Sequence, residues 1–252
     1  MYAAEIPVSD QDQLITSSDW TEISNLQDEM KKEEPDATID YDKALKVYVD
    51  CNLIKLQTAD TKKLTSALES ANYVWVIPFK MEKTYGMFTV AKGLPLSEEA
   101  KSVLTKAEQE EVKNHAGKWM ITETAEHTVE PYYDILLEKR EALSDCTRVV
   151  LVGSQPGMRQ PVALGMDDET ARIWISLGYQ YPVMEKIPET QNVESGVYSF
   201  DSVAEISDTY IEDSEVSTGA GVQSRSSMKY VAGIGIIVIG SCLLYTSPSP
   251  RD

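Results

Sequence analysis

Alternating apolar and polar residues predict β-strands through the central part of the chain. Residues 45–53 carry apolar side chains at every second position, which is the period of a half-buried strand. Residues 73–79 are apolar on both faces and predict a central strand, with 85–90 as its hairpin partner. A short strand is predicted at 119–122. A three-stranded meander with intervening turns is predicted at 148–152, 161–164 and 171–177.

Helical spacing of apolar residues predicts about three helices between these strands. The first is capped by Asp60 or Thr61. The longest opens at Ser97 and stops at Gly117, and the third follows Pro131. Because hairpins alternate with helices, the sequence predicts an α+β fold with one mixed domain and a mainly antiparallel sheet.

Charge is distributed unevenly, and it predicts the domain limits. The formal net charge is -18, but residues 41–186 are nearly balanced. Residues 1–40 hold eleven acids against two lysines, and residues 187–217 hold eight acids and no base. Blocks of like charge resist collapse. We therefore predict a globular domain at 41–186, an acidic, mostly extended arm at 1–40 with a marginal helix near 19–32, and a disordered Ser/Thr-rich linker at 187–227.

The same composition limits the ligands. Nucleic-acid binding is disfavoured, because Lys and Arg do not cluster where they would neutralise consecutive phosphates. Asp36, Asp40 and Asp42 are closely spaced but lack the glycine and glutamate of a calcium loop. His115 and His127 do not form a metal-ligand pattern. We predict no metal and no cofactor.

An apolar run near the C-terminus predicts a membrane anchor. Residues 230–241 carry no charge, but they are fewer than the roughly 20 that span a bilayer. The segment that follows, 242–252, resembles translated sequencing adapter, and we interpret it as not native. On this interpretation 228–241 is a truncated transmembrane helix, and Cys242 is not a native cysteine.

Two features bear on the side of the membrane. Arg225 and Lys229 precede the apolar run, which under the positive-inside rule favours a cytosolic domain. Residues 1–5 have the small residues found at the end of a signal peptide, without its apolar region. The acidic linker also suits a stalk outside a cell. We favour a single-pass cell-membrane protein with an extracytoplasmic N-terminal domain whose signal peptide is missing, and a cytosolic domain is the alternative.

Two cysteines precede the adapter-like segment. Cys51 and Cys146 lie in or beside predicted strands. In an exported domain they can form a disulfide that closes a long loop, and in a reducing compartment they stay buried thiols. Their spacing alone does not choose between the two, because pairing requires Cα atoms within about 7 Å.

Catalytic motifs are poorly represented. Residues 153–157, Gly-Ser-Gln-Pro-Gly, follow a strand but lack the Gly-x-Ser-x-Gly order and the helix of a nucleophile elbow. Turn chemistry explains them, because Pro-Gly is itself a turn signal. A hydrolase would also need His127 to reach Ser154. We therefore favour a protein that is not an enzyme, with a membrane-tethered hydrolase as the least favoured class.

Aromatic residues supply the remaining functional lead. Trp174 is predicted on the polar face of its strand, with Tyr179 and Tyr181 just beyond it, so the three can form a partner surface. Packing of these rings in the core is the favoured alternative. The sequence thus predicts a membrane-anchored extracytoplasmic binding or sensory domain that meets the membrane and an unknown protein or small ligand. A surface structural or adhesive protein is the alternative.

Overall fold

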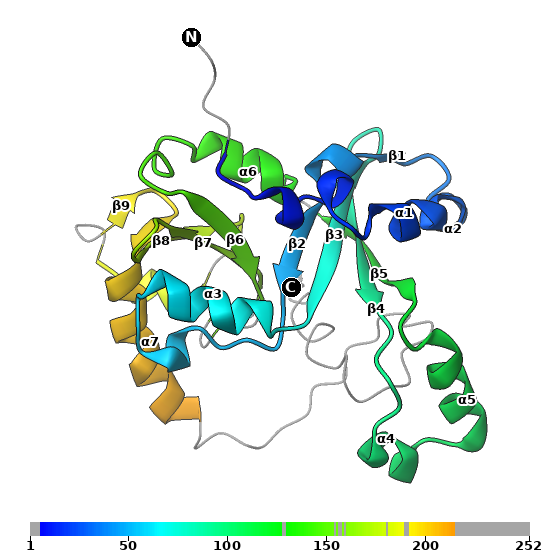
Figure 1. Ribbon diagram of the computed structural model, residues 1–252. Coiled ribbons are helices and arrows are strands. Elements are labelled where there is room, and N and C mark those ends of the chain that lie inside the picture. Colours follow the sequence, from blue (N-terminus) through cyan, green and yellow to red (C-terminus); the bar gives the residue numbers. More distant parts are fainter. Residues whose placement is uncertain are drawn as a thin grey trace, which may run out of the picture.

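A large, mainly antiparallel sheet with helices on both faces forms the fold (Figure 1). The computed structural model describes residues 6–127, 130–153, 155, 158, 160–179, 181–188 and 192–214. The predicted α+β class with a mainly antiparallel sheet is confirmed. The strands are β1 (Thr38–Ile39), β2 (Leu45–Tyr48), β3 (Tyr73–Lys80), β4 (Tyr85–Lys92), β5 (Trp119–His127), β6 (Arg148–Val152), β7 (Val162–Met166), β8 (Ala171–Ser176), β9 (Asn192–Glu194) and β10 (Val197–Ser199).

Two antiparallel halves make up this sheet. Its strand order is β5-β4-β3-β2-β6-β7-β8-β10-β9, with β1 paired to β3. The hairpin of β3 and β4 continues into β5 on one side, and β6, β7 and β8 form the predicted meander on the other. Strands β2 and β6 join the halves in parallel, with Val47 opposite Leu151.

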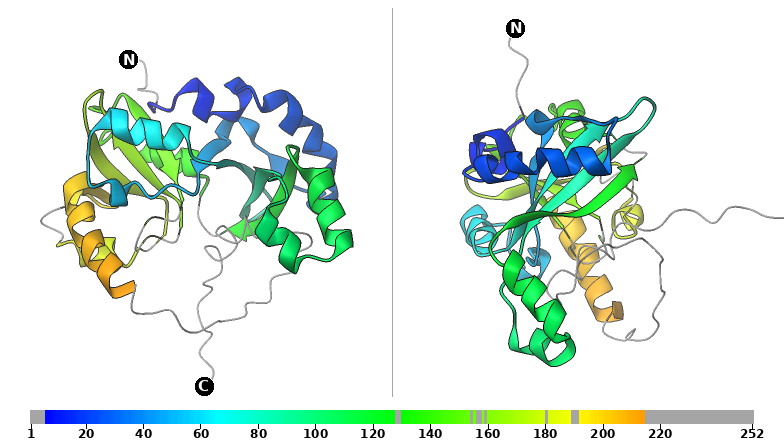
Figure 2. Two further views of the ribbon diagram at one scale, coloured as in Figure 1. Left: turned by 60° about the horizontal axis from the view of Figure 1, so that its bottom comes forward. Right: turned by 90° about the vertical axis from the view of Figure 1, so that its right-hand side faces the viewer.

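Helices cover both faces of the sheet and extend one end of it. The α-helices are α1 (Trp20–Ile23), α2 (Gln27–Glu33), α3 (Thr61–Glu69), α4 (Glu98–Val103), α5 (Lys106–His115), α6 (Tyr132–Glu138) and α7 (Phe200–Ser214). Short 3₁₀ helices are η1 (Asp10–Asp12), η2 (Leu14–Thr16), η3 (Ser24–Leu26), η4 (Tyr41–Lys43), η5 (Ile54–Leu56) and η6 (Met184–Lys186). Helices α4 and α5 project away from the sheet beyond β4 and β5 (Figures 1 and 2).

The long helix expected from Ser97 to Gly117 is two helices. Leu104 is extended, with ψ 142°, and Thr105 is the N-cap residue of α5. The Thr105 hydroxyl accepts from the Glu108 amide, and the Glu108 carboxylate accepts from the Thr105 amide at 2.7 Å. This capping box satisfies free donors at the start of a helix, so it favours a new helix here over a continuous one.

Three clusters of buried side chains form the core. The α6 cluster lies on one face of the sheet and includes Leu136, Val149 and Leu151. Val150 and Val152 point to the opposite face, as the two-residue period of a strand requires, and belong to the α3–α7 cluster. The N-terminal cluster packs against β3 and β4 and is formed by Leu14, Ile23, Met30, Ala37, Ala44, Trp75, Ile77, Phe79, Phe88, Val90 and Trp119.

The N-terminal part of the chain differs from the predicted extended arm at 1–40. Leu14, Ile23 and Met30 are fully buried, and Val8 forms a parallel bridge with Val149. The apolar residues here are sparse, so the sequence shows no strong helical stripe, yet several of them are buried in the core. The arm prediction gave too much weight to the summed charge and is corrected here for residues 6–40.

The C-terminal limit of the domain also differs from the predicted limit at residue 186. Strand β10 pairs with β8, with Val197 opposite Ile175, and α7 buries Phe200 and Val203. The described part of the predicted linker therefore includes packed structure, because this short apolar group supplies a buried face. Residues 215–227, the expected transmembrane segment 228–241 and the adapter-like residues 242–252 lie outside the described residues. Within the described part, no helix is long and apolar enough to cross a membrane.

Candidate functional site

A buried aspartate is the centre of a charged network between the N-terminal segment and the sheet. Asp12 is 2% exposed. Its Oδ1 accepts from the Tyr48 hydroxyl at 2.7 Å, and its Oδ2 accepts from Arg148 Nη2 at 2.9 Å. The Ser9 hydroxyl donates to Oδ2 at 2.6 Å, and Lys46 Nζ lies 3.8 Å from Oδ1. A buried carboxylate requires such cations and donors, because its transfer from water is otherwise very costly.

Lys46 extends this network into a group of aromatic rings. Its Nζ lies 4.4 Å from the ring centre of Tyr73 and 5.2 Å from that of Trp75. The Tyr73 hydroxyl and the Trp75 indole nitrogen both donate to Asp19 Oδ2, at 2.9 Å and 3.0 Å. Ring faces attract a cation, and the attraction strengthens when water is excluded. Burial lowers the pKa of Lys46, and the nearby charge of Asp12 opposes this shift.

The geometry assigns this network a structural role. A lysine with a lowered pKa can act as a nucleophile. The Lys46 side chain, however, is only 10% exposed and is held by Asp12 and three aromatic rings. The network connects η1, β2, β3 and β6, so its charges stabilise the packing of the N-terminal segment on the sheet.

A second titratable group lies on the other face of the sheet. Glu123 is opposite Thr89 in the β4–β5 pair, and Thr89 is opposite Val76 of the α6 cluster. Its Oε2 is buried and has no hydrogen-bond partner in the described part of the chain. Burial raises the pKa of Glu123 to about 7. This carboxyl therefore changes charge near neutral pH.

Two tyrosines share the environment of Glu123. The hydroxyls of Tyr132 and Tyr179 are 3.2 Å apart, one from α6 and the other from the segment after β8. Burial raises the pKa of both tyrosines, and the negative charge of Glu123 adds to each rise. Both phenols stay neutral at physiological pH, so Glu123 is the group among these three that titrates there.

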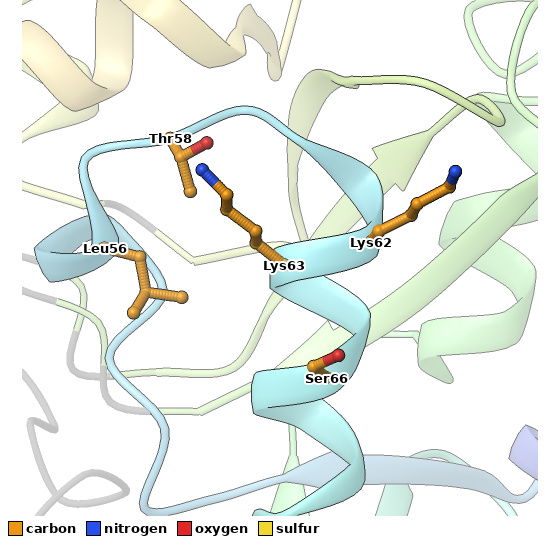
Figure 3. Close-up of a pocket in the computed structure, with 5 residues that line it drawn as sticks. All are labelled: Leu56, Thr58, Lys62, Lys63 and Ser66. Atoms are coloured by element: carbon orange, nitrogen blue, oxygen red, sulfur yellow. The ribbon is translucent and has the colours of Figure 1, made fainter.

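A hollow of about 440 Å³ lies on the surface between η5 and α3 (Figure 3). Leu56 comes from η5, Thr58 from the connecting segment, and Lys62, Lys63 and Ser66 from α3. Figure 3 shows the Lys63 ammonium turned toward Thr58, whereas Lys62 points away from it. The hollow is open to solvent and combines an apolar side chain with a cation.

Local backbone geometry sets the shape of this hollow. Gln57, between Leu56 and Thr58, has φ 47°, in the left-handed region that non-glycine residues seldom adopt. The Asp60 side chain caps α3 by accepting from the Lys63 amide at 3.1 Å. Leu56 is 43% exposed. Neither Lys62 nor Lys63 forms an ion pair with a residue that the structure describes.

Cys51 and Cys146 do not form the disulfide considered from the sequence. Both are free thiols. Cys146 belongs to the α6 cluster, and its sulfur lies where a Cβ on Gly165 would approach within 2.8 Å. Cys51 packs against the α3–α7 cluster on the opposite face, so the sheet separates the two residues. Burial raises the pKa of each thiol to about 11, which keeps both protonated and unreactive at neutral pH.

The three aromatic residues considered as a partner surface are mostly core residues. Trp174 is fully buried and stacks on Phe200, with 5.8 Å between ring centres. Tyr181 is 2% exposed, and its hydroxyl donates to the Pro161 carbonyl. Tyr179 is half-buried beside Tyr132. The surface interpretation of Trp174 and Tyr181 is therefore corrected, because α7 covers a strand face that the sequence assigned to solvent.

The remaining sequence hypotheses receive little from the structure. Ser154 lies outside the described residues, and His127 ends β5. Throughout the described ranges, no group of three or more His, Cys, Asp or Glu residues is arranged to hold a metal ion. The sequence interpretation also missed Asp12, Lys46 and Glu123. Glu123 is a charged residue directly after the predicted strand 119–122, which was the available signal, but the strand was expected to end before it.

Comparisons do not place the chain in a known group. No family model, no curated protein and no solved structure matches it.

Replacing Asp12 tests the buried network. We expect Asp12→Asn to lower the free energy of unfolding by about 3 kcal/mol, because it leaves the Arg148 and Lys46 charges without their buried counter-ion. Urea unfolding followed by tryptophan fluorescence measures the change. Asp10→Asn, at an exposed position in the same 3₁₀ helix, is the matched control. Equal stability of the two variants would contradict the structural role.

Glu123 predicts a pH dependence of stability. Its pKa rises from 4.5 to about 7 on folding, so its contribution is complete below pH 4.5 and is lost as the pH rises through 7. We expect Glu123→Gln to raise the melting temperature relative to the parent chain at about pH 8, with the difference shrinking toward acid pH. Thermal unfolding at low protein concentration over this range measures it. Glu126→Gln, at an exposed position of the same strand, should give no trend of this kind.

Proposed function

We propose that this chain is a membrane-anchored extracytoplasmic binding or sensory domain whose ligand occupies the hollow between η5 and α3. The observation that carries the proposal is the combination of the exposed Leu56 side chain with the Lys63 ammonium in one open hollow. Such a surface fits a small ligand, or a peptide side chain, that joins a short apolar part to an acidic group.

Charge supports the choice of an acidic ligand. The chain as a whole carries a net charge of -18, so most of its surface repels anions. Lys62 and Lys63 are adjacent and exposed at the start of α3, and both line the hollow. These lysines give the hollow a local charge opposite to that of the protein, which favours an acidic ligand there over other positions.

The position of α7 supports a sensory role. Helix η5 contacts α7, which lies within the segment predicted as a linker and precedes the apolar run 230–241 in the sequence. Figure 1 shows α3 and α7 on the same side of the molecule. A ligand that contacts Leu56 thus lies one element away from α7, which comes before the proposed membrane anchor in the sequence. A shift in η5 would change the packing of α7.

Matched probes test the hollow. We expect hexanoate to shift the amide resonances of Leu56, Thr58 and Lys63 in the full chain, and hexylammonium to leave them unchanged, because only the first places an anion beside Lys63. We expect Lys63→Gln to weaken hexanoate binding about tenfold, through loss of a charge-assisted contact. Lys83→Gln, at an exposed position in the β3–β4 turn, is the control. Equal binding of both probes, or no effect of Lys63→Gln, would reject the hollow as an acid-binding site.

Protease accessibility tests the proposed topology. An extracytoplasmic domain is cleaved when protease is added to intact cells, because the membrane does not shield it. We expect the full chain, expressed with a signal peptide, to lose its N-terminal domain under this treatment, while a cytosolic marker protein stays intact. Protection of the domain until the cells are lysed would favour the cytosolic alternative.

A further inference from the structure

Strand β5 is a long, open edge of the sheet. It pairs with β4 from His127 to Trp119 and ends the strand order on that side. In the described part of the chain, no backbone hydrogen bond besides those to β4 involves residues 119–127. The opposite edge is the three-residue β9. An open edge of this length presents unpaired backbone groups that can bind another strand.

Glu123 lies in the middle of this edge and faces inward. It occupies the side of β5 that faces the α6 cluster, where an apolar residue would pack most favourably. The residue is half-buried, and its Oε2 is buried and lacks a hydrogen-bond partner among the described residues.

A β-bulge adjoins the same residue. The register between β4 and β5 shifts between Thr89 and Val90, so Thr122 is an extra residue in β5. The Thr122 hydroxyl donates to the Thr89 carbonyl at 3.1 Å. A bulge disturbs the regular spacing that an added strand would need. An irregular ladder and an inward-facing charge therefore coincide at the centre of the edge.

We propose that Glu123 prevents a second copy of this chain from pairing with β5, and that loss of its negative charge permits that pairing. A strand added beside β5 would cover more of the half-buried Glu123 side chain. The charged form would then lose more of its remaining solvation, which is costly for an unpaired carboxylate.

A second copy is the partner that this edge fits. Two β5 edges related by a twofold axis run antiparallel and present the same free donors and acceptors to each other. Their pairing around the middle of the strand would bring two Glu123 carboxylates together as like charges. Both costs disappear when Glu123 is neutral, so its charge opposes this association more strongly than the net charge alone does.

The groups that face Glu123 do not change their charge near neutral pH, so the charge of Glu123 itself determines the effect. They are Tyr132 from α6, Tyr179 from the segment after β8 and the uncharged Thr89 from β4. Burial raises the pKa of both tyrosines, so neither ionises near neutral pH. A fall in pH through 7 neutralises Glu123.

Sedimentation of three variants of the full chain in one detergent buffer tests the proposal. At about pH 8 and 100 µM, we expect Glu123→Gln to dimerise with at least tenfold higher affinity than Glu126→Gln or the parent. Glu123→Lys keeps an inward-facing charge and should stay as monomeric as the parent. At about pH 6, the parent should associate as Glu123→Gln does, and Glu123→Lys should not.

Hydrogen exchange locates the contact. In the Glu123→Gln dimer, the amides of 119–127 should gain protection, while those of β9 should not. Equal sedimentation of Glu123→Gln and Glu126→Gln would overturn the proposal, and so would association without protection at 119–127. Thermal unfolding of each variant confirms that it is folded, and an unfolded Glu123→Lys is replaced by Glu123→Arg, for which the same results are expected.

Discussion

The burial of the Asp12 carboxylate is the constraint on which the arrangement of this domain depends. A negative charge at 2% exposure is stable only where cations and donors surround it, and Arg148, Lys46 and Tyr48 supply them from two strands. Those strands are β2 and β6, which join the two halves of the sheet. The aspartate therefore fixes the N-terminal segment at the junction of the halves, and Leu14, Ile23 and Met30 can pack beside it.

The strands were the most predictable part of this fold, because their two-residue period is a local property. The central strand at 73–79, its partner at 85–90 and the meander all appear close to their expected positions. The ends of the domain were not predictable in this way. The charge counts describe the average solvation of a whole segment. Single residues such as Ile23 and Phe200 are nevertheless buried, because they contact strands of the sheet. The split between α4 and α5 depends on one capping box at Thr105, which competes with a continuous apolar stripe.

The candidate site was less predictable than the fold. Lys46 looked like an ordinary polar residue of a half-buried strand, and its importance appears only when Tyr73 and Trp75 lie beside it. Trp174 had the alternation of a solvent-facing residue, but α7, which comes later in the sequence, covers it. The hollow at Leu56 arises from a 3₁₀ helix and a left-handed residue, neither of which has a strong sequence signal. The surroundings of Lys46 and Trp174, in contrast, depend on contacts between segments that are separated in the sequence.

The parallel pairing of β2 with β6 has a consequence for how this chain folds. Each half of the sheet is built from hairpins between neighbouring segments, which close small loops at low entropic cost. The junction instead brings together Val47 and Leu151, which are about a hundred residues apart. Contacts of such separation form slowly, so the halves can acquire structure before they meet. The topology therefore favours a folding order in which the local hairpins form first and the two halves pair at the centre of the sheet last.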